Sequence, residues 1–214
     1  MGLIAKNIIL TITEIYNQFL ADIQIVTWQE WVSTIAQIAS VWYASKNNIL
    51  VFPTGIIGVV LATYVYFFLC SPALYADALL NIYYCIMSIY GWYNWIQKKN
   101  NQITYPITWC TTTQLGIGFG FFVAFWGIIY TMLTKLTNSN TPVLDALVAA
   151  TAITAMWWMA KRKIENWLAW MVSNIIAIPL NFYKGFMLFT LMYVLFLAMA
   201  SVGFINWKKQ IVHG

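Results

Sequence analysis

Residues 91–95 read GWYNW and residues 203–207 read GFINW, so a Gly-x-x-Asn-Trp pattern occurs twice with an offset of 112 positions. Each copy stands at the end of a long apolar stretch. Two further pairs keep nearly the same spacing: VWYASK (41–46) with MWWMAK (156–161), offset by 116 at their tryptophans Trp42 and Trp158, and Asn48 with Asn166, offset by 118. Interfacial anchoring of aromatic residues accounts for any single pair but not for all of them in register. The spacing therefore predicts an internal repeat.

The composition restricts the class of protein to integral membrane proteins. Of the 214 residues, 62% are hydrophobic and only 8% are charged, whereas about a quarter of a soluble domain is charged. The net charge of +5 has no soluble domain to carry it, so nucleic-acid binding is not expected. The sequence has three cysteines without metal-type spacing, no phosphate-binding loop and no recognisable nucleophile–base pair. We therefore predict neither a cofactor or metal site nor an enzyme.

Seven apolar segments are long enough to cross a bilayer. They are separated by turn or charge signals such as SKNN, KKNNQ and KRK. The predicted spans are 30–45, 48–69, 74–96, 114–135, 143–161, 165–182 and 186–206. Residues 1–27 alternate isoleucines and polar residues at helical spacing and predict an amphipathic helix on the membrane surface. An eighth span at the start is the alternative.

The repeat and the spans together predict an all-α membrane protein with two three-helix units, at 28–97 and 141–207. Residues 98–140 form a loop and a linker helix between them, and 208–214 form a tail. With an odd number of helices per unit and a single linker helix, both units have the same orientation. The result is a pair of parallel repeats in a 3+1+3 arrangement, which some transporters have.

The basic residues predict the orientation. The N-terminus and the loops on its side of the predicted spans hold three of them, and the opposite side holds eight. The side richer in Lys and Arg is normally cytoplasmic. The eight are Lys46, Lys98, Lys99, Lys161, Arg162, Lys163, Lys208 and Lys209, and the three are Lys6, Lys135 and Lys184. The C-terminus is therefore expected in the cytoplasm and the N-terminus outside.

Three spans carry narrow polar and aromatic faces. At 100° per residue the members of each set share one side of a helix. The sets are Trp167, Trp170, Asn174 and Asn181; Asp77, Asn81, Tyr84, Ser88, Trp92 and Trp95; and Thr34 with Gln37. Hydrogen bonding between helices is one interpretation. Bulky rings between the amides favour a lined cavity for a planar heteroaromatic ligand, and a cationic ring would gain cation–π attraction there.

Large residues beside this face are candidates for gates, namely Trp95, Trp158 and Tyr90. An offset of 118 places Ile49, Phe52 and Ile56 opposite Trp167, Trp170 and Asn174, so one unit alone would supply the aromatic–amide face. The chain has six acidic residues and one histidine, too few for a buried proton relay, which favours facilitated transport over ion-driven pumping.

At this point two segments resemble a known family. ENWLAWMVSN (165–174) is similar to the E-N-W-x-x-W-x-x-x-N signature of PnuC-type vitamin transporters, and the segment ending in YGWYNW (90–95) is similar to their third helix. In this family Trp167, Trp170 and Asn174 take signature positions, and Tyr90, Gly91, Trp92 and Trp95 match the third-helix ending.

The resemblance implies uptake of nicotinamide riboside, a precursor of NAD, by facilitated diffusion across a bacterial inner membrane. It also implies a fold like that of the SWEET sugar transporters, a homo-oligomer and a separate cytoplasmic kinase that traps the substrate. The family pattern differs at Asn81 and Ser88, which leaves a thiamine or riboflavin carrier as the alternative. A membrane structural or assembly protein remains as an alternative from another class, and an integral-membrane enzyme stands third.

Overall fold

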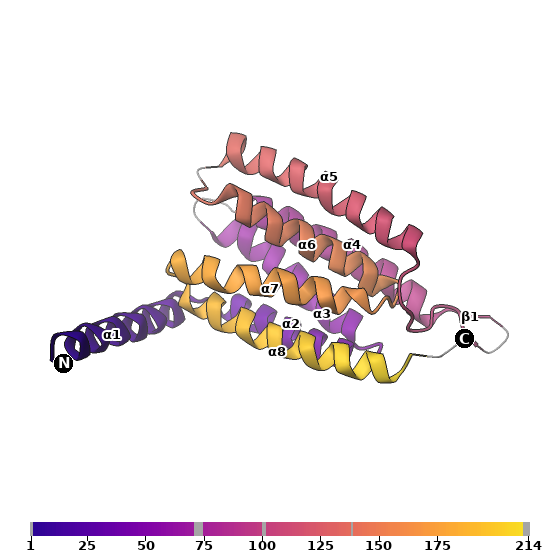
Figure 1. The fold of residues 1–214 in the computed structure, drawn as a ribbon, viewed down its shortest axis with the longest axis horizontal. Coiled ribbons are helices and arrows are strands. Elements are labelled where there is room, and N and C mark those ends of the chain that lie inside the picture. The colour runs from indigo at the N-terminus through magenta and orange to yellow at the C-terminus, as the bar shows by residue number, and fades with distance from the viewer. Residues whose placement is uncertain (1, 71–74, 100–101, 138, 212–214) are drawn as a thin grey trace.

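The computed structural model describes residues 2–70, 75–99, 102–137 and 139–211, and it is built almost entirely of helices (Figure 1). The elements are α1 (Gly2–Ile25), α2 (Trp28–Ser45), α3 (Val51–Tyr64), the π-helical segment η1 (Val65–Leu69), α4 (Tyr75–Ile96), β1 (Lys98–Lys99), β2 (Gln102–Ile103), α5 (Thr112–Leu136), α6 (Pro142–Ala160), α7 (Glu165–Tyr183) and α8 (Met187–Lys209).

Each of the seven predicted spans coincides with a helix to within a few residues at either end. Four helical segments are long and apolar enough to cross a bilayer, namely Val51–Leu69, Thr112–Leu136, Pro142–Ala160 and Met187–Lys209. The remaining three, α2, α4 and α7, carry the predicted polar and aromatic faces, which lowers their mean hydropathy. The chain is thus an all-helical membrane protein in which the least apolar helices are those predicted to line a cavity.

Six helices form a closed ring. In order of contact they are α2, α3, α4, α6, α7 and α8, and α8 returns to α2. Helix α5 packs on α6 at the outside of the ring (Figure 1). Helix α5 has one buried residue, Gly118, whereas ten residues of α6 are buried. The ring gives α4 and α7 no shared edge, so side chains that join them cross its interior.

Helix α1 projects from one end of the bundle and contacts α8 (Figure 1). The Asp22 carboxylate accepts a hydrogen bond of 3.2 Å from the backbone N–H of Leu188, in the first turn of α8. The first N–H groups of a helix have no partner within it, so Asp22 satisfies one of them. Residues 2–25 are helical as predicted, while the position of this helix relative to a membrane stays a prediction.

Helices α2 and α6 end in the same unusual turn. Asn47 has φ 53° and Arg162 has φ 52°, in the left-handed region that residues other than glycine seldom adopt. The hydrogen bonds also match: Asn47 N–H to Ala44 O and Arg162 N–H to Met159 O are both 2.9 Å. These two turns are 115 positions apart, within the range of offsets that predicted the repeat.

The asparagines of the two Gly-x-x-Asn-Trp motifs reach across to these turns. The Asn94 amide at the end of α4 donates to the Ala160 carbonyl at the end of α6, at 3.2 Å. The Asn206 amide at the end of α8 donates to the Ser45 carbonyl at the end of α2, at 3.3 Å. Terminal carbonyls of a helix lack partners inside it, so each motif completes a helix of the other half of the chain.

The tryptophans of the motifs also donate to carbonyls at the end of a helix in the other half of the chain. The Trp95 indole N–H donates to the Met159 carbonyl at 3.3 Å, and the Trp207 indole N–H donates to the Ala44 carbonyl at 2.8 Å. The two indoles lie side by side, with ring centroids 5.8 Å apart. We call the four side chains the crossed lock: Asn94, Trp95, Asn206 and Trp207.

Each motif glycine gives room to one ring. A Cβ at Gly91 would lie 2.5 Å from the Phe52 ring, and a Cβ at Gly203 would lie 2.6 Å from the Trp167 ring. Both rings then meet the motif tryptophan of their own half edge to face, at 4.9 Å for Phe52 and 5.5 Å for Trp167. Phe52 and Trp167 are therefore structural counterparts, with an offset of 115.

This pairing corrects the predicted alignment of the two halves. The offset of 118 placed Phe52 opposite Trp170, one helical turn too far. With Phe52 opposite Trp167, the positions of Trp170 and Asn174 correspond to Gly55 and Val59. The error of three residues leaves each side chain near the same face of its helix, so hydrophobic periodicity did not detect it.

The motif glycines provide a test of this packing. Gly203→Ala should lower the melting temperature of the purified protein markedly, because overpacking a core costs about 1–3 kcal/mol. Gly120→Ala on α5 is the matched control, since no atom lies within 4 Å of its Cβ position and alanine favours a helix. Equal melting temperatures for the two variants, measured by circular dichroism, would contradict the proposed close contact.

Candidate functional site

Two aromatic rings meet across the interior of the ring of helices. Trp170 on α7 and Tyr84 on α4 have ring centroids 6.3 Å apart and planes inclined by 48°. Both side chains are only partly buried although they belong to helices that face the interior. Each ring therefore keeps part of its surface accessible, and the aromatic-lined cavity expected from the sequence stays a prediction.

Polar groups beside these rings have no protein partner. The Trp170 indole nitrogen is buried and makes no hydrogen bond to any residue that the structure describes. Asn174, one turn further along α7, is 3% exposed, and its amide likewise makes no hydrogen bond within the described ranges. Buried polar groups are nearly always paired in native proteins. A donor and an amide without partners beside two exposed rings indicate a binding site for a polar aromatic molecule.

Ser173, next to Asn174, makes a hydrogen bond between helices, which is the alternative role considered for the polar residues of this helix. Its hydroxyl donates to the Val148 carbonyl on α6 at 3.1 Å. The corresponding contact in the first half runs in the opposite direction, since the Ser33 hydroxyl on α2 donates to the Gly58 carbonyl on α3 at 2.8 Å. These two serines join neighbouring helices, which is the usual task of small polar residues in a membrane bundle.

Gln37 belongs with these structural contacts. Its amide donates to the Ser33 hydroxyl at 3.0 Å, and its Cγ lies 2.7 Å from where a Cβ at Gly58 would be. Gln37 therefore takes part in packing between α2 and α3, and its predicted substrate contact stays a prediction. Thr34 is half-buried on the same helix, and Ser88 is 3% exposed on α4.

Two of the predicted asparagines bond to their own helices. The Asn81 amide donates to the Asp77 carbonyl at 2.9 Å, and the Asn181 amide donates to the Ala177 carbonyl at 2.8 Å. Such bonds leave the side-chain oxygen available as an acceptor. Trp92 is 38% exposed and makes no ring contact among the described aromatic residues, so the structure separates it from Trp170 and Tyr84.

Trp167 has a different position from the one expected of a stacking residue. It is 1% exposed and lies between Gly203 and the edge of Trp207. In this structure Trp167 packs against Trp207 of the crossed lock, so its predicted stacking on a ligand stays a prediction. Trp170 on the same helix is only partly buried and contacts Tyr84.

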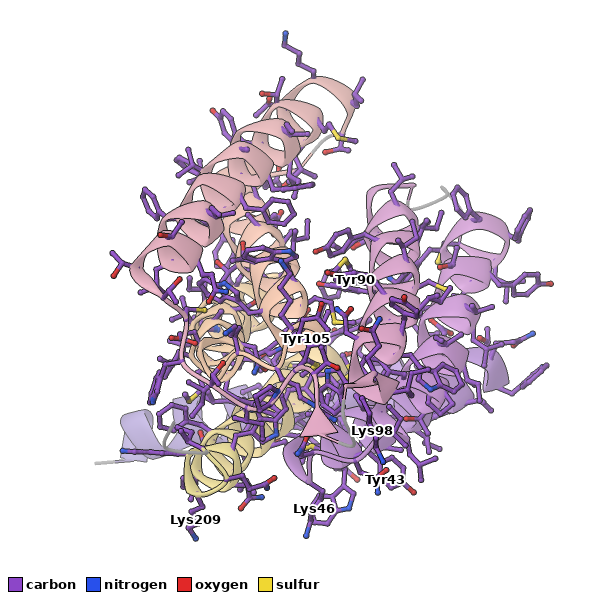
Figure 2. The ribbon with its side chains drawn as sticks, turned by 90° about the vertical axis from the view of Figure 1, so that its right-hand side faces the viewer. Tyr43, Lys46, Tyr90, Lys98, Tyr105 and Lys209 are labelled. Atoms are coloured by element: carbon purple, nitrogen blue, oxygen red, sulfur yellow. The ribbon has the colours of Figure 1, made fainter. Side chains whose placement is uncertain are left out.

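The predicted gates are similarly divided. Trp95 is part of the crossed lock at the end of the bundle where the lysines gather (Figure 2). Trp158 is not between the two halves, because its indole fills the space at Gly118 and so packs α6 against α5. Tyr90 is 38% exposed on α4 (Figure 2). Of the three, Trp95 is the one that joins the ends of α4 and α6, and all three gating roles stay predictions.

A buried cation covers the crossed lock. Arg162 is 6% exposed, its guanidinium carbon lies 4.3 Å from the centroid of Trp95, and its Nη1 donates to the Tyr105 carbonyl at 3.1 Å. Burial lowers the pKa of Arg162 to about 10, so the side chain remains protonated at neutral pH and gains cation–π attraction to the indole. From the sequence, Arg162 was expected only as a charged residue of a loop.

The segment that precedes α5 lies against the same turn. Thr108 N–H donates to the Arg162 carbonyl at 3.3 Å, and Ile164 N–H donates to the Thr108 carbonyl at 3.1 Å. Cys110 N–H donates to the Glu165 carboxylate at 2.7 Å. Burial and the adjacent carboxylate raise the pKa of the Cys110 thiol to about 12. This segment therefore holds the end of α6 and the start of α7 in place.

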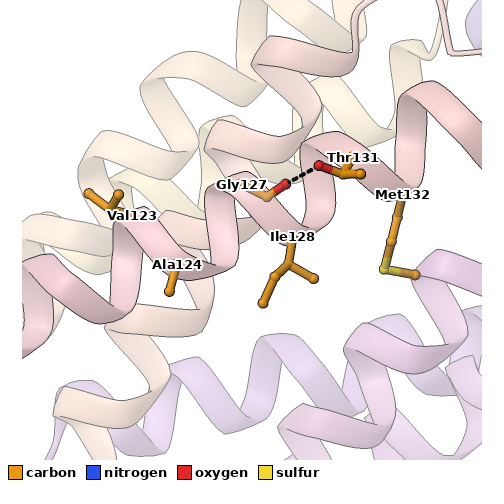
Figure 3. Close-up of a pocket in the computed structure, with 6 residues that line it drawn as sticks. All are labelled: Val123, Ala124, Gly127, Ile128, Thr131 and Met132. Atoms are coloured by element: carbon orange, nitrogen blue, oxygen red, sulfur yellow. Dashed lines mark hydrogen bonds between the residues drawn. The ribbon is translucent and has the colours of Figure 1, made fainter.

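A surface depression lies elsewhere, on the linker helix α5 (Figure 3). It is apolar and open, and one internal bond, from the Thr131 hydroxyl to the Gly127 carbonyl at 2.7 Å, is the polar feature drawn there. Its lining residues are Val123, Ala124, Gly127, Ile128, Thr131 and Met132. None of them belongs to the predicted site, and a shallow apolar surface lacks the polar groups that would orient a ligand.

Comparison with known proteins agrees with the geometry of the candidate site. The profile of the family described as "Nicotinamide mononucleotide transporter" matches residues 27–209. The nicotinamide riboside transporter PnuC of Escherichia coli (strain K12) is 26% identical over 206 residues, covering 85% of each chain. The riboflavin/roseoflavin transporter RibM of Streptomyces davaonensis is 27% identical over 124 residues, covering 56% of this chain and 58% of the relative.

The structure is also similar to a solved one, described as the crystal structure of the vitamin B3 transporter PnuC. The TM-score is 0.67 at 25% sequence identity, with 93% of this chain and 88% of the other covered. The similarity therefore extends over nearly the whole fold.

The two tryptophans of α7 can be told apart by stability. Trp167→Ala should lower the free energy of unfolding by about 3–5 kcal/mol, the usual cost of removing a fully buried tryptophan. Trp170→Ala should cost clearly less, because that ring is only partly buried. Melting temperatures in detergent measure both. A larger loss for Trp170→Ala would contradict the assignment of Trp167 to the packed core.

Proposed function

Because the chain belongs to the nicotinamide mononucleotide transporter family, we propose that it is a membrane transporter for nicotinamide riboside. Relatives named for this substrate cover 85% of the chain, and the fold is similar to that of a vitamin B3 transporter. The protein would lie in a bacterial inner membrane as a multi-pass protein and supply the cell with a precursor of NAD.

The observation that carries the proposal is the group of Trp170, Asn174 and Tyr84 in the interior of the ring. Nicotinamide riboside contains a flat pyridinium ring, a carboxamide and ribose hydroxyls. The two aromatic faces suit the ring, and a positive charge on it adds cation–π attraction. The free Asn174 amide and the free Trp170 indole N–H suit the carboxamide and the hydroxyls, which need both donors and acceptors.

The arrangement of helices supports alternating access. We assign α2–α4 and α6–α8 to two parallel three-helix repeats with α5 as the linker, which is the 3+1+3 organisation predicted from the sequence. The crossed lock would close the ring at one end while the site communicates with the other. Rocking of the repeats about the site would break the lock and release the substrate.

The charge distribution supports an orientation. Lys46, Lys98 and Lys209 gather at the end of the bundle that holds the crossed lock (Figure 2). Since cytoplasmic loops are normally rich in Lys and Arg, we place the lock and the C-terminus in the cytoplasm. The opposite end, where α1 joins the ring, would then face the outside and admit the substrate.

Energy for accumulation would come from chemistry after transport. The chain has only six acidic residues, and five of them precede α2 or lie in the outer part of a ring helix, so no relay of acids crosses the bundle. Facilitated diffusion followed by phosphorylation by a separate cytoplasmic kinase would trap the substrate. A homo-oligomer would be compatible with the exposed apolar face of α5, but it is the family resemblance that suggests it.

Riboflavin is the alternative substrate that a specific finding supports, since RibM matches 56% of this chain. Riboflavin has an uncharged, three-ring flavin, whereas nicotinamide riboside has one charged ring. A site that depends on cation–π attraction would therefore favour nicotinamide riboside. Thiamine, which is also cationic, must be tested beside both.

Uptake into liposomes tests the proposal. Protein reconstituted without kinase should equilibrate labelled nicotinamide riboside across the membrane and should accumulate it only when an NAD-precursor kinase and ATP are enclosed. Accumulation above the external concentration without kinase would exclude facilitated diffusion. Transport of riboflavin or thiamine in preference to nicotinamide riboside would assign a different vitamin, and transport of none would leave a structural role.

Asn174→Leu should reduce this uptake at least tenfold, because leucine removes the amide one helical turn from Trp170 and loses a hydrogen bond of about 1.4 kcal/mol or more. Val172→Leu is the control, since it introduces the same residue on the same helix at a position that is 49% exposed. Uptake by Asn174→Leu at the level of the control would remove Asn174 from the site.

A further inference from the structure

We propose that Arg162 is the latch of the crossed lock: its guanidinium reaches across the boundary between the two halves and holds Trp95 in the closed position. The inference rests on the proposed function, because a latch presupposes that the halves separate during transport. It deepens that function by assigning control of the closed state to one side chain that does not touch the substrate.

The contact between Arg162 and Trp95 joins the two halves of the chain. Trp95 lies in the last turn of α4, in the first half, whereas Arg162 lies in the turn between α6 and α7, in the second. The guanidinium carbon is 4.3 Å from the centroid of the Trp95 ring. Both side chains are buried, so their cation–π attraction is little weakened by water. Separation of the halves at this end must therefore part the ring from the cation.

The backbone of this turn does not require an arginine. Asn47 occupies the equivalent turn of the first half with φ 53°, against 52° for Arg162, and asparagine enters this left-handed region more readily than most residues. No cation lies over Trp207, the partner of Trp95, among the residues that the structure describes. The buried arginine is thus a feature of one half alone, and the shape of the turn does not explain it.

The segment 104–110, which we call the strap, holds the Arg162 side chain in position. The Tyr105 carbonyl accepts from Arg162 Nη1 at 3.1 Å. The Thr108 N–H donates to the Arg162 carbonyl at 3.3 Å, and the Ile164 N–H donates to the Thr108 carbonyl at 3.1 Å. The strap therefore pairs with the backbone on both sides of this side chain and also binds its guanidinium.

The strap is itself anchored to the second half. The Lys163 ammonium donates to the Thr108 hydroxyl at 2.7 Å, and the Cys110 N–H donates to the Glu165 carboxylate at 2.7 Å. These partners lie in the turn between α6 and α7 and in the first turn of α7. Arg162 and the strap therefore belong to one unit with the second half, and Trp95 belongs to the unit that separates from it.

The guanidinium has few partners for a buried cation. Its Nη1 is bonded to the strap, while its Nε is buried without a hydrogen-bond partner. In the described ranges of the chain no carboxylate forms an ion pair with Arg162. Burying a charge without an opposite charge costs free energy, and hydration of the guanidinium on opening would recover part of it. The contact with Trp95 thus favours the closed end without making it permanent, as a gate requires.

The alternative role of Arg162 is to stabilise the fold of the strap and of the turn. Substitution would then lower the melting temperature but leave the ratio of open to closed arrangements unchanged. A latch changes this ratio, and its effect depends on the presence of the Trp95 ring. The two roles are therefore separated by measuring the ratio in single and double variants.

Pulsed electron spin resonance in lipid nanodiscs measures this ratio with labels at Lys98, which follows α4, and Lys209, which ends α8. Both labelled residues are exposed. Without substrate, Arg162→Asn should raise the ratio of long to short distances about tenfold, equivalent to about 1.4 kcal/mol. The native cysteines are first replaced by alanine in every sample, namely Cys70, Cys85 and Cys110.

Two further variants serve as controls. Lys161→Asn removes a cation from the same turn, but Lys161 lies over Trp157 of its own half at 4.3 Å, so the ratio should change less than twofold. Arg162→Lys keeps the positive charge and the backbone preference but lacks the planar guanidinium. Its ratio should lie between those of the wild type and Arg162→Asn.

Trp95→Leu tests the contact from the other half and should itself raise the ratio. In that background Arg162→Asn should raise the ratio further by less than threefold, because the latch has already lost its ring. The same tenfold effect with and without Trp95 would show that Arg162 acts through the turn, and the latch would be overturned.

The outcomes separate the latch from the proposed function. The distance measurements need no substrate, whereas uptake of nicotinamide riboside into liposomes tests transport. If the wild type takes up the substrate but Arg162→Asn leaves the ratio unchanged, or Lys161→Asn raises it equally, the latch is overturned while the transport function stands. If the wild type takes up no vitamin while the ratio responds as predicted, the proposed function fails and the opening at this end serves another purpose.

Discussion

In this protein, side chains of each half donate hydrogen bonds to the terminal carbonyls of a helix in the other half. Four carbonyls at the ends of α2 and α6 accept from the crossed lock, Asn94, Trp95, Asn206 and Trp207. Within a bilayer or at its edge an unpaired carbonyl costs several kcal/mol, so the exchange fixes how the halves meet at this end. We propose that this exchange also serves as a gate, because water can replace the lost hydrogen bonds when the halves separate there.

The two halves share this framework but differ where the substrate would lie. In the first half Gly55 allows close approach of α3 to α2, where a Cβ would lie 2.9 Å from the Ser40 hydroxyl, and that hydroxyl donates to the Val51 carbonyl at 2.7 Å. In the second half the equivalent position is Trp170, which reaches the interior. In the proposed site, the second half alone supplies the aromatic–amide face, and the first half has a small residue, Gly55, at the position equivalent to Trp170. A symmetric scaffold can in this way hold an asymmetric ligand such as a nucleoside.

Much of this arrangement could be predicted from the sequence, because apolar runs and repeated motifs are local features. The helix bounds and the repetition of Gly-x-x-Asn-Trp are examples. The roles of individual rings could not be predicted, because they depend on which helix lies opposite. Trp167 and Trp170 are one turn apart and share a face, yet Trp167 is enclosed against Gly203 while Trp170 is only partly buried.

The central claim is that the crossed lock opens and closes during transport. Its most direct test is the distance between the turns that follow α2 and α6, measured by pulsed electron spin resonance on labels at Lys46 and Lys161 in lipid nanodiscs. With nicotinamide riboside present, the account predicts two distances, one matching the closed end seen here and one longer. A single distance that nicotinamide riboside leaves unchanged, in protein that transports it in liposomes, would contradict the account.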